Sequence, residues 1–181
     1  MPTLIRLASE ADAAGIASIY RRYVEDSWIS FEDSPPDAAE MTRRITGERP
    51  GFYPWFVAEE DGRLLGYAAS SPFRTRSAYR WTVETGVYLA ADAQGRGVGK
   101  ALLSTLLGVL QRQGYVAAIG AIALPNEASI ALHEKLGFTY AGTYRGVGFK
   151  LGQWLDVGLW QKQLAPRDSA PAEPLPFAGL T

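Results

Sequence analysis

The spacing of hydrophobic residues along the chain predicts an alternation of strands and helices. Apolar runs that alternate with polar residues, or are continuous, predict strands at 3–8, in two runs within 54–73, and at 81–90, 115–124, 139–150 and 154–163. A period of about 3.6 residues predicts helices at 11–25, 37–46, 98–113 and 125–137. The two runs within 54–73 flank Asp61-Gly62, the commonest two-residue hairpin signal. The resulting order, βααβββαβαββ, predicts a mixed, strongly twisted α/β sheet with helices on both faces.

Length and composition describe one globular domain followed by a tail. The 181 residues suit a single domain, which we place at residues 1–165. The segment 166–181, "PRDSAPAEPLPFAGLT", is rich in Pro and Ala and is predicted to be a tail or linker.

Charge and rare residues exclude several classes of function. Lysine and arginine number 18 against 19 aspartate and glutamate residues, so charge gives no reason to expect nucleic acid or a membrane surface as a partner. The chain has no cysteine and one histidine, which argues against a disulfide, a thiolate nucleophile and a protein-built metal site. The start of the chain lacks the features of a secretory signal, and the most apolar run, 115–124, is about half as long as a membrane span. We therefore expect a cytoplasmic enzyme or binding domain.

A glycine-rich segment, "QGRGVGK" from Gln94 to Lys100, lies between a predicted strand and a predicted helix. Backbone N–H groups and the positive end of a helix can hold phosphate oxygens at such a place. The segment does not fit the P-loop pattern, which needs glycine at Gln94 and Ser or Thr at Ala101. It does not fit the dinucleotide pattern either, which needs glycine at Lys100 or Leu102. A tight connection without a ligand is the alternative interpretation.

Two motifs together resemble one enzyme family. The string "QGRGVGKALL" resembles the pyrophosphate loop of the GNAT superfamily of N-acetyltransferases, Gln/Arg-x-x-Gly-x-Gly/Ala, through Gln94, Gly97 and Gly99. The string "NEASIALHEKLGF" is similar to a later motif of that family, and a predicted strand separates the two. The resemblance implies the GNAT fold with acetyl-CoA as cosubstrate.

The resemblance extends to a narrower group within that superfamily. The strings "SAYRWTVETGVYL", "LPNEASIALHEKLGF" and "WLDVGLWQ" are similar to phosphinothricin N-acetyltransferases and related L-amino acid N-acyltransferases. This resemblance implies transfer of acetyl from acetyl-CoA to the α-amine of a small amino acid, such as phosphinothricin, methionine sulfoximine or methionine sulfone. Related enzymes are often homodimers, although no pattern in this sequence marks a dimer surface.

The resemblance also implies the cofactor contacts. The backbone of Val87, Tyr88 and Leu89 would pair with the pantetheine arm, and Asn126 with Ser129 would meet the far side of the cofactor. The residues that would bind the pyrophosphate are Gly95, Arg96, Gly97, Val98, Gly99 and Lys100.

Glu84 is the candidate general base. An α-ammonium group must lose a proton before its nitrogen can attack a thioester. In "WTVETGVY" Glu84 shares one face of the strand with Thr82, Gly86 and Tyr88. Burial in a strand raises the pKa of an unpaired carboxyl group, which suits a base at neutral pH. The resemblance places the catalytic glutamate of the family here, and a structural carboxylate paired with an arginine is the alternative.

The string "FRTRSAY" supplies candidate contacts to the acceptor. Guanidinium groups bind carboxylate or phosphinate bidentately, so Arg74 and Arg76, with Tyr79, are predicted to hold the acceptor's oxygens. Family members contact phosphinothricin from matching positions, and Arg74 occupies a place where lysine is also found. By the same resemblance, Phe31 would cover the aliphatic part of the acceptor and Val157 would lie on the substrate side. A solvated loop and core packing are the alternatives.

His133 lies on the same predicted helix stripe as Asn126 and Ser129. In many acetyltransferases of the superfamily a tyrosine at the corresponding place protonates the departing thiolate, and the phosphinothricin group shares the histidine. An imidazole titrates near pH ~6.5, so it could give a proton to sulfur or take one from the amine. The alternative is a hydrogen-bonded side chain that only packs.

These observations predict an acetyl-CoA-dependent amino acid N-acetyltransferase that works by direct attack in a ternary complex. One alternative is a GNAT enzyme that acts on another amine, such as a peptide N-terminus or a polyamine. The other is an acyl-CoA-binding module without catalysis. The arginine-rich loop and the aromatic residues before it favour a closed pocket for a small anion.

Overall fold

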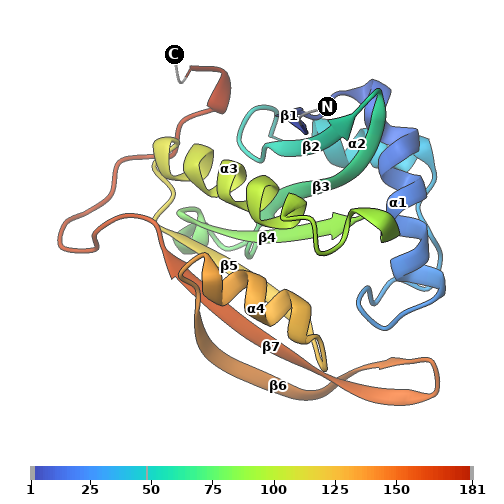
Figure 1. Cartoon of the computed structure of the whole chain (residues 1–181). Helices are drawn as coiled ribbons and strands as arrows, with labels where there is room; N and C mark the ends of the chain where they lie inside the picture. Colours follow the sequence, from blue (N-terminus) through green and yellow to red (C-terminus); the bar gives the residue numbers. More distant parts are fainter. Residues whose placement is uncertain (1–2, 48, 180–181) are drawn as a thin grey trace.

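The computed structural model describes residues 3–47 and 49–179 as a seven-stranded sheet with helices on both faces (Figure 1). The predicted order βααβββαβαββ is confirmed, and the strands lie in the spatial order β1-β2-β3-β4-β5-β7-β6. The strands are β1 (Leu4–Leu7), β2 (Trp55–Glu60), β3 (Arg63–Pro72), β4 (Thr82–Leu89), β5 (Ala117–Ala123), β6 (Thr139–Lys150) and β7 (Gln153–Gln163). The helices are α1 (Ala13–Glu25), α2 (Ala38–Thr46), α3 (Val98–Arg112) and α4 (Glu127–Lys135).

Each face of the sheet is covered by two helices. On one face, α1 and α2 bury apolar side chains such as Ile16 and Met41 in a cluster with Val57 of β2. On the other, Leu106 of α3 lies in a cluster with Val83 of β4, and α4 packs on the same cluster. Figure 1 shows α3 and α4 in front of the strands. Across the described residues, no helix has the length and apolar character needed to cross a membrane.

Glycines with a left-handed backbone end several elements where the sequence predicted. Asp61 (φ 51°) and Gly62 (φ 76°) form the turn of the β2–β3 hairpin. Gly114 (φ 91°) follows α3 and Gly137 (φ 83°) follows α4. Because glycine adopts such a backbone without steric strain, Gly62, Gly114 and Gly137 set the ends of the elements.

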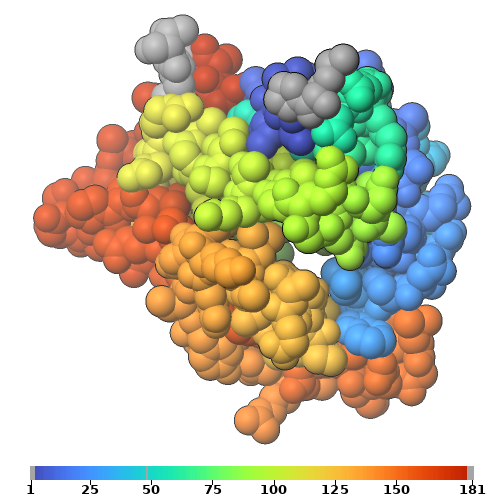
Figure 2. Space-filling view, viewed as in Figure 1, coloured from blue at the N-terminus to red at the C-terminus, as the bar shows by residue number. Residues whose placement is uncertain are grey.

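Strands β4 and β5 run parallel and part from each other half-way along. Their pairing extends only from Thr82 opposite Ala117 to Glu84 opposite Ile119. Beyond that point β4 continues to Leu89 beside β3, and β5 continues beside β7. Figure 2 shows the resulting hollow, bounded by the segment before α3, by α4 and by the connector that follows α1.

The connector between α1 and α2 crosses to the far half of the sheet. The indole Nε1 of Trp28 donates to the carbonyl oxygen of Pro125 at 3.3 Å, just before α4. The ammonium group of Lys150 in β6 donates to the carbonyl oxygens of Val24 and Ser30, each at 2.6 Å. The connector is therefore held beside the gap between β4 and β5.

Candidate active site

A cavity of about 600 Å³, which we call the cofactor cavity, lies at the gap between β4 and β5. Its walls come from the end of β4, the glycine loop before α3, the far half of β5 and α4. The structure therefore brings the two sequence motifs together at one place. The predicted cofactor residues that line it are Val87, Tyr88, Leu89, Gly95, Gly97, Gly99, Lys100, Asn126 and Ser129.

The backbone of the glycine loop is turned toward this cavity. Gly95 (φ 73°) and Gly97 (φ 82°) adopt the left-handed conformation, and α3 begins directly after Gly97. A Cβ atom on Gly99 would lie 3.3 Å from the side chain of Leu89 and 3.4 Å from that of Leu132. The first turn of α3 can therefore present free N–H groups at the cavity, which is the arrangement that binds phosphate.

Two predicted loop residues, Arg96 and Val98, do not line the cavity. The guanidinium group of Arg96 donates to both carboxylate oxygens of Glu60, at 2.9 and 3.1 Å. Val98 is buried in the core beneath α3. Only the backbones of these two residues are placed to contribute to a phosphate site.

Tyr23 of α1 also lines the cavity and was not predicted to do so. Its hydroxyl donates to the carbonyl oxygen of Leu89 at 2.7 Å and accepts from the N–H of Leu89 at 3.2 Å. Both backbone groups of Leu89 are thus engaged within the protein, so Val87 is the neighbouring residue whose backbone faces the gap, while that of Tyr88 faces β3. No local pattern reveals this contact, because the two residues are far apart in sequence.

A second cavity, of about 660 Å³, lies on the α1 side of the sheet; we call it the acceptor-side cavity. Thr85, Gly86, Tyr88 and Ala121 line both cavities, which therefore meet where the strands part. Strand β5 is buried at each position except Ala121, which is exposed here. The parting of the strands is the reason, since it leaves this part of β5 without a neighbour.

Glu84 lines the acceptor-side cavity and is the last residue of β4 that pairs with β5. Its side chain is half-buried. Burial raises the pKa of this carboxyl group above the ordinary value for glutamate, while the positive charge of Arg74 acts in the opposite direction. A carboxyl group with a raised pKa in the acceptor-side cavity, next to Thr85 where the two cavities meet, is suited to accept a proton near neutral pH.

His133 lies in the wall of the cofactor cavity and is 3% exposed. Its Nδ1 donates to the carbonyl oxygen of Ser129 at 2.8 Å, so Nδ1 carries the proton. Its Nε2 is buried and has no hydrogen-bond partner among the described residues. Burial lowers the pKa of the imidazole, and it outweighs the hydrogen bond to Ser129, which acts in the opposite direction. Burial therefore favours the neutral form of the ring, with the lone pair on Nε2.

Glu84 and His133 lie on opposite faces of the sheet. The ring of Tyr88 packs edge-on against that of Tyr20 in α1, with 4.9 Å between the ring centres. Glu84 is four residues before Tyr88 on β4, so its side chain lies on the same face of the sheet, the face that α1 covers. A Cβ atom on Gly120 would lie 2.6 Å from the His133 ring, so the imidazole lies directly over β5 on the α4 face. The two candidates thus face different cavities.

Three predicted acceptor residues lie on or near the β6–β7 half of the sheet. Arg74 donates to the hydroxyl of Tyr144 in β6 at 3.2 Å. Phe31 is 40% exposed and covers Gly148 of β6. Val157 pairs with Tyr144 across the β6–β7 ladder. None of the three lines the two main cavities.

Arg76 and Tyr79 lie in the loop between β3 and β4, which we call the arginine loop (residues 73–81). The carbonyl oxygen of Arg76 accepts from the N–H of Tyr79 at 3.0 Å in a short 3₁₀ turn. The ring of Tyr79 packs edge-on against Phe73 at 5.5 Å. Within residues 3–47 and 49–179, neither Arg74 nor Arg76 forms an ion pair. Both guanidinium groups therefore remain available to an anion.

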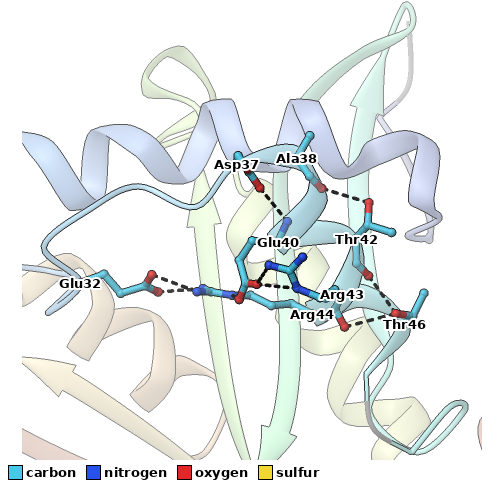
Figure 3. Close-up of polar contacts among 8 residues, drawn as sticks. All are labelled: Glu32, Asp37, Ala38, Glu40, Thr42, Arg43, Arg44 and Thr46. Carbon is cyan, nitrogen blue, oxygen red and sulfur yellow. Dashed lines mark hydrogen bonds and ion pairs between the residues drawn. The ribbon is translucent and has the colours of Figure 1, made fainter.

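A polar network in the acceptor-side cavity was not predicted. Arg44 of α2 donates to the two carboxylate oxygens of Glu32 at 2.7 and 3.0 Å, and to Glu40 at 2.9 Å (Figure 3). The hydroxyl of Tyr20 donates to Glu32 at 2.9 Å. The Arg44 guanidinium holds the pKa of Glu32 below its ordinary value. This network fixes the connector after α1 to α2, and only the tertiary fold brings its members together.

The family is decided by the sequence of the whole domain. Residues 5–159 match the family model described as an acetyltransferase (GNAT) domain. The chain belongs to the GNAT acetyltransferase family. It is therefore an N-acetyltransferase, and acetyl-CoA is the cosubstrate of the family.

Relatives of this GNAT enzyme are similar over almost its whole length. The phosphinothricin N-acetyltransferase of Streptomyces viridochromogenes is 39% identical over 99% of this chain and 96% of that protein. The L-methionine sulfoximine/L-methionine sulfone acetyltransferase of Pseudomonas aeruginosa is 37% identical over 94% of this chain and all of that protein, a coverage of 100%. A crystal structure of a phosphinothricin acetyltransferase from Sinorhizobium meliloti in complex with AcCoA has a TM-score of 0.91 and 39% identity, and covers 99% of this chain and 98% of that one.

Proposed function

We propose that this GNAT enzyme acetylates the α-amine of a small L-amino acid with an anionic or oxygen-rich side chain. Phosphinothricin, methionine sulfoximine and methionine sulfone represent this class, and they are acceptors named for the relatives. The observation that carries the proposal is the position of Glu84, at the point where β4 and β5 part. A loop with two unpaired arginines precedes the same strand, so a base and an anion-binding group lie near one another in the chain.

The cofactor cavity fits acetyl-CoA. The left-handed Gly95 and Gly97 turn the backbone toward the cavity, and the start of α3 would hold the pyrophosphate. The free edge of β4 at Val87 would pair with an amide of the pantetheine arm. Asn126 and Ser129 line the opposite wall, although the Asn126 side chain also caps α4 by accepting from the N–H of Ser129 at 3.2 Å.

In the proposed reaction, Glu84 takes the proton that leaves the α-ammonium group. The freed nitrogen lone pair forms a bond to the acetyl carbonyl carbon, the carbon–sulfur bond breaks, and the thiolate leaves with the bonding pair. The nitrogen loses its second proton as the amide forms, and that proton goes, directly or through water, to the thiolate, which leaves as the CoA thiol. His133 is assigned as a hydrogen-bond acceptor on the cofactor side, because its Nδ1–H donates a hydrogen bond to the carbonyl oxygen of Ser129 and its lone pair lies on Nε2. In that tautomer Nε2 can accept a hydrogen bond but has no proton to donate to the sulfur.

The acceptor's carboxylate and side-chain oxygens are assigned to Arg74, Arg76 and Tyr79. The two guanidinium groups supply positive charge without an internal ion pair, which supports binding of an anion. Phe31 and Val157 are assigned to the aliphatic part of the acceptor. Phe31 is exposed enough to close over a ligand on the β6 side.

The test is release of CoA thiol from acetyl-CoA in the presence of a panel of acceptors. We expect fast release with phosphinothricin and methionine sulfone, and slow release with their amides, which lack the free α-carboxylate. Equal rates with acids and amides would remove the arginine assignment. Binding of acetyl-CoA without acceleration by any amine would show a binding module instead of an enzyme.

A longer amine is the second candidate acceptor. The acceptor-side cavity, at about 660 Å³, is larger than a small amino acid requires and reaches Arg49 and Tyr53 beyond α2. A peptide with a free N-terminus and a polyamine therefore belong in the same panel. Higher kcat/KM with either of them than with the amino acids would favour this candidate.

We also propose that the enzyme is a cytoplasmic homodimer, as the resemblance implies. Large apolar side chains are exposed on the β6–β7 hairpin at the edge of the sheet, which supports association with a second copy: Tyr140, Tyr144, Val147, Phe149, Leu151 and Trp154. Light scattering is expected to give twice the chain mass, and Trp154→Lys is expected to halve it. A monomeric native enzyme would contradict the dimer, and cell fractionation tests the compartment.

A further inference from the structure

The C-terminal strap, which we define as residues 166–177, lies along the surface of the domain. It leaves the end of β7 and passes around the C-terminal end of α3 (Figure 1). The strap forms no strand, and its only helical residue is Phe177, where a 3₁₀ turn begins. Its attachment depends on side chains and single backbone hydrogen bonds.

The first attachment is at the end of the arginine loop. Glu173 accepts from Nε and Nη2 of Arg80 at distances of 2.7 to 2.9 Å. The next residue, Trp81, donates from its indole Nε1 to the carbonyl oxygen of Ala172 at 2.8 Å. The Arg80 guanidinium also lies 3.5 Å from the centre of the Trp81 ring. Two consecutive residues of the loop are thus held by two consecutive residues of the strap.

The second attachment is at Gln113, the residue that follows α3. Its Nε2 donates to the carbonyl oxygen of Leu175 at 2.9 Å, and its own carbonyl oxygen accepts from the N–H of Leu175 at 2.7 Å. Gln113 is 1% exposed and also donates to Gly51 and Phe52, at 3.2 and 3.1 Å. The N–H of Phe177 donates to the Gly51 carbonyl oxygen at 2.7 Å. The strap is therefore tied to the loop before β2 as well.

Both tied loops border the acceptor side of the sheet. Arg80 and Trp81 lie between the predicted acceptor residues of the arginine loop and Glu84 on β4. The loop before β2 carries Arg49 and Tyr53, which line the acceptor-side cavity. No strap residue lines the cofactor cavity or the acceptor-side cavity. The strap therefore acts on the acceptor's surroundings only through the two loops that it holds.

A third cavity, of about 410 Å³, lies between the strap and the arginine loop. Phe73 and Tyr79 of the loop line it together with four strap residues. Its lining also includes Thr82 and Ile119, and Ile119 pairs with Glu84. The strap residues that line it are Pro166, Arg167, Ser169 and Pro171.

We propose that the C-terminal strap is a positioning element of the acceptor site: it holds the arginine loop in place relative to Glu84. The inference rests on the proposed function, since it assigns the loop to the acceptor. Loss of the Arg80–Glu173 contact leaves the loop with two long-range side-chain hydrogen bonds among the described residues, from Arg74 to Tyr144 and from Trp81 to Ala172 of the strap. The loop then samples positions in which Arg76 and Tyr79 do not meet the ligand.

Glu173→Arg in the full-length chain tests the proposal. It replaces an attraction to Arg80 with a repulsion at an exposed position, so the domain is expected to fold. We expect the KM for the acceptor to rise about threefold to fivefold, the range that an exposed ion pair can account for, while the KM for acetyl-CoA stays within about 1.5-fold. Glu25→Arg is the matched control, because it reverses a charge in the exposed Arg21–Glu25 pair on α1. Its acceptor KM is expected to equal that of the wild type.

The charge swap Arg80→Glu with Glu173→Arg is the rescue. It restores the attraction in the opposite sense and is expected to return at least half of the lost acceptor affinity. Hydrogen exchange supplies a readout without turnover: peptides covering residues 74–81 are expected to exchange faster in Glu173→Arg and to slow again in the swap. An unchanged acceptor KM, a parallel rise of both KM values, or no rescue by the swap would each overturn the proposal.

The same measurements separate the two proposals. A wild-type enzyme that acetylates no amino acid contradicts the proposed function, whatever the strap variants do. An active wild type with an indifferent Glu173→Arg contradicts the strap alone. Unchanged exchange of residues 74–81 in Glu173→Arg contradicts the attachment itself, even in an enzyme whose acceptor is another amine.

Discussion

The two sides of the gap between β4 and β5 are built in different ways. The cofactor side combines a strand edge, a glycine loop and a helix start that follow one another between Thr82 and Arg112 with a wall from β5 and α4, the next two elements of the chain. The acceptor side presents side chains from segments far apart in the sequence: the connector after α1, α2, the arginine loop and β6. A ligand shared by a whole family can be held by backbone, whereas a particular acceptor needs particular side chains.

This difference separates the two functions physically. Backbone N–H groups and left-handed glycines bind a pyrophosphate whatever side chains surround them. Guanidinium and carboxyl groups bind only acceptors of matching charge and shape. Substitutions on the acceptor side are therefore expected to change the substrate while acetyl-CoA binding persists.

Glu84→Gln should have the largest effect on turnover, and it should leave the binding of acetyl-CoA almost unchanged. Loss of a general base is expected to lower kcat about 100-fold or more. The affinity for acetyl-CoA is expected to change less than about twofold, because Glu84 lines the acceptor-side cavity and not the cofactor cavity. Single-turnover kinetics with equilibrium binding of acetyl-CoA measures both, with the exposed Glu10→Gln as control. A variant that keeps its rate across the pH range would eliminate Glu84 as the base.

Gly120→Ala tests how closely His133 lies on the sheet. The added methyl carbon would lie 2.6 Å from the imidazole ring, so the ring or the strand must move. We expect a loss of about 1–3 kcal/mol in the free energy of unfolding, the usual range for overpacking. Urea unfolding measures it, with Gly108→Ala as the matched control, where the nearest atom is the end of the Arg112 side chain at 4.0 Å. Equal stability of the two variants would show that the ring is not confined.

The same difference explains what the sequence could predict. The order of elements, the hairpin at Asp61-Gly62 and the glycine loop follow from local patterns, and the structure agrees with each. The cofactor wall follows too, because its two motifs are contiguous strings. Tyr23 was missed, since its bonds to Leu89 join residues that only the packing of α1 on the sheet brings together.

On the acceptor side, local patterns gave the residue types but not their surroundings. Arg74 and Arg76 were named as candidates from the string "FRTRSAY", and Glu84 from the string "WTVETGVY". The Glu32–Arg44 pair joins a connector to a helix, and no spacing rule links the two. The helix stripe placed His133 beside Asn126 and Ser129, but it did not show that His133 and Glu84 lie on opposite faces of the sheet. That depends on the strand register and on which face α4 covers.

Gly97→Ala and Arg96→Ala, as a pair, test whether the cofactor side depends on its backbone. Alanine at φ 82° is strained by about 1–2 kcal/mol, which corresponds to roughly tenfold weaker binding of acetyl-CoA if the loop shifts to relieve the strain. Arg96→Ala removes a side chain that is bonded to Glu60, so its acetyl-CoA affinity is expected to stay within about twofold. Calorimetric titration with CoA measures both. A larger loss in Arg96→Ala than in Gly97→Ala would reverse the interpretation of the loop.

His133→Phe and His133→Asn separate acceptance at Nε2 from packing. Phenylalanine keeps the ring over Gly120 but has no lone pair, so the loss of one hydrogen bond is expected to lower kcat up to about tenfold. Asparagine keeps a polar group but loses the contact with Phe138, now 4.9 Å between ring centres, and is expected to unfold at lower temperature. If the phenylalanine variant retains the full rate, His133 serves only as part of the helix face.

Arg74→Gln should have the smallest effect, and it tests whether the charge of Arg74 sets the pKa of Glu84 on the acceptor side. A base works only when deprotonated, so kcat/KM rises with pH through the pKa of Glu84. The positive charge of Arg74 lowers that pKa, and its removal must raise it. We therefore expect the acid limb of the kcat/KM profile to move to higher pH, by less than about one unit because the site is partly solvated.

Arg76→Gln is the control: the charge of Arg76 is not among the causes of the Glu84 shift, so this variant is expected to raise the acceptor KM without moving the limb. An acid limb that stays in place in Arg74→Gln would mean that another group controls it, and the assignment of Glu84 would then depend on the glutamine variant alone.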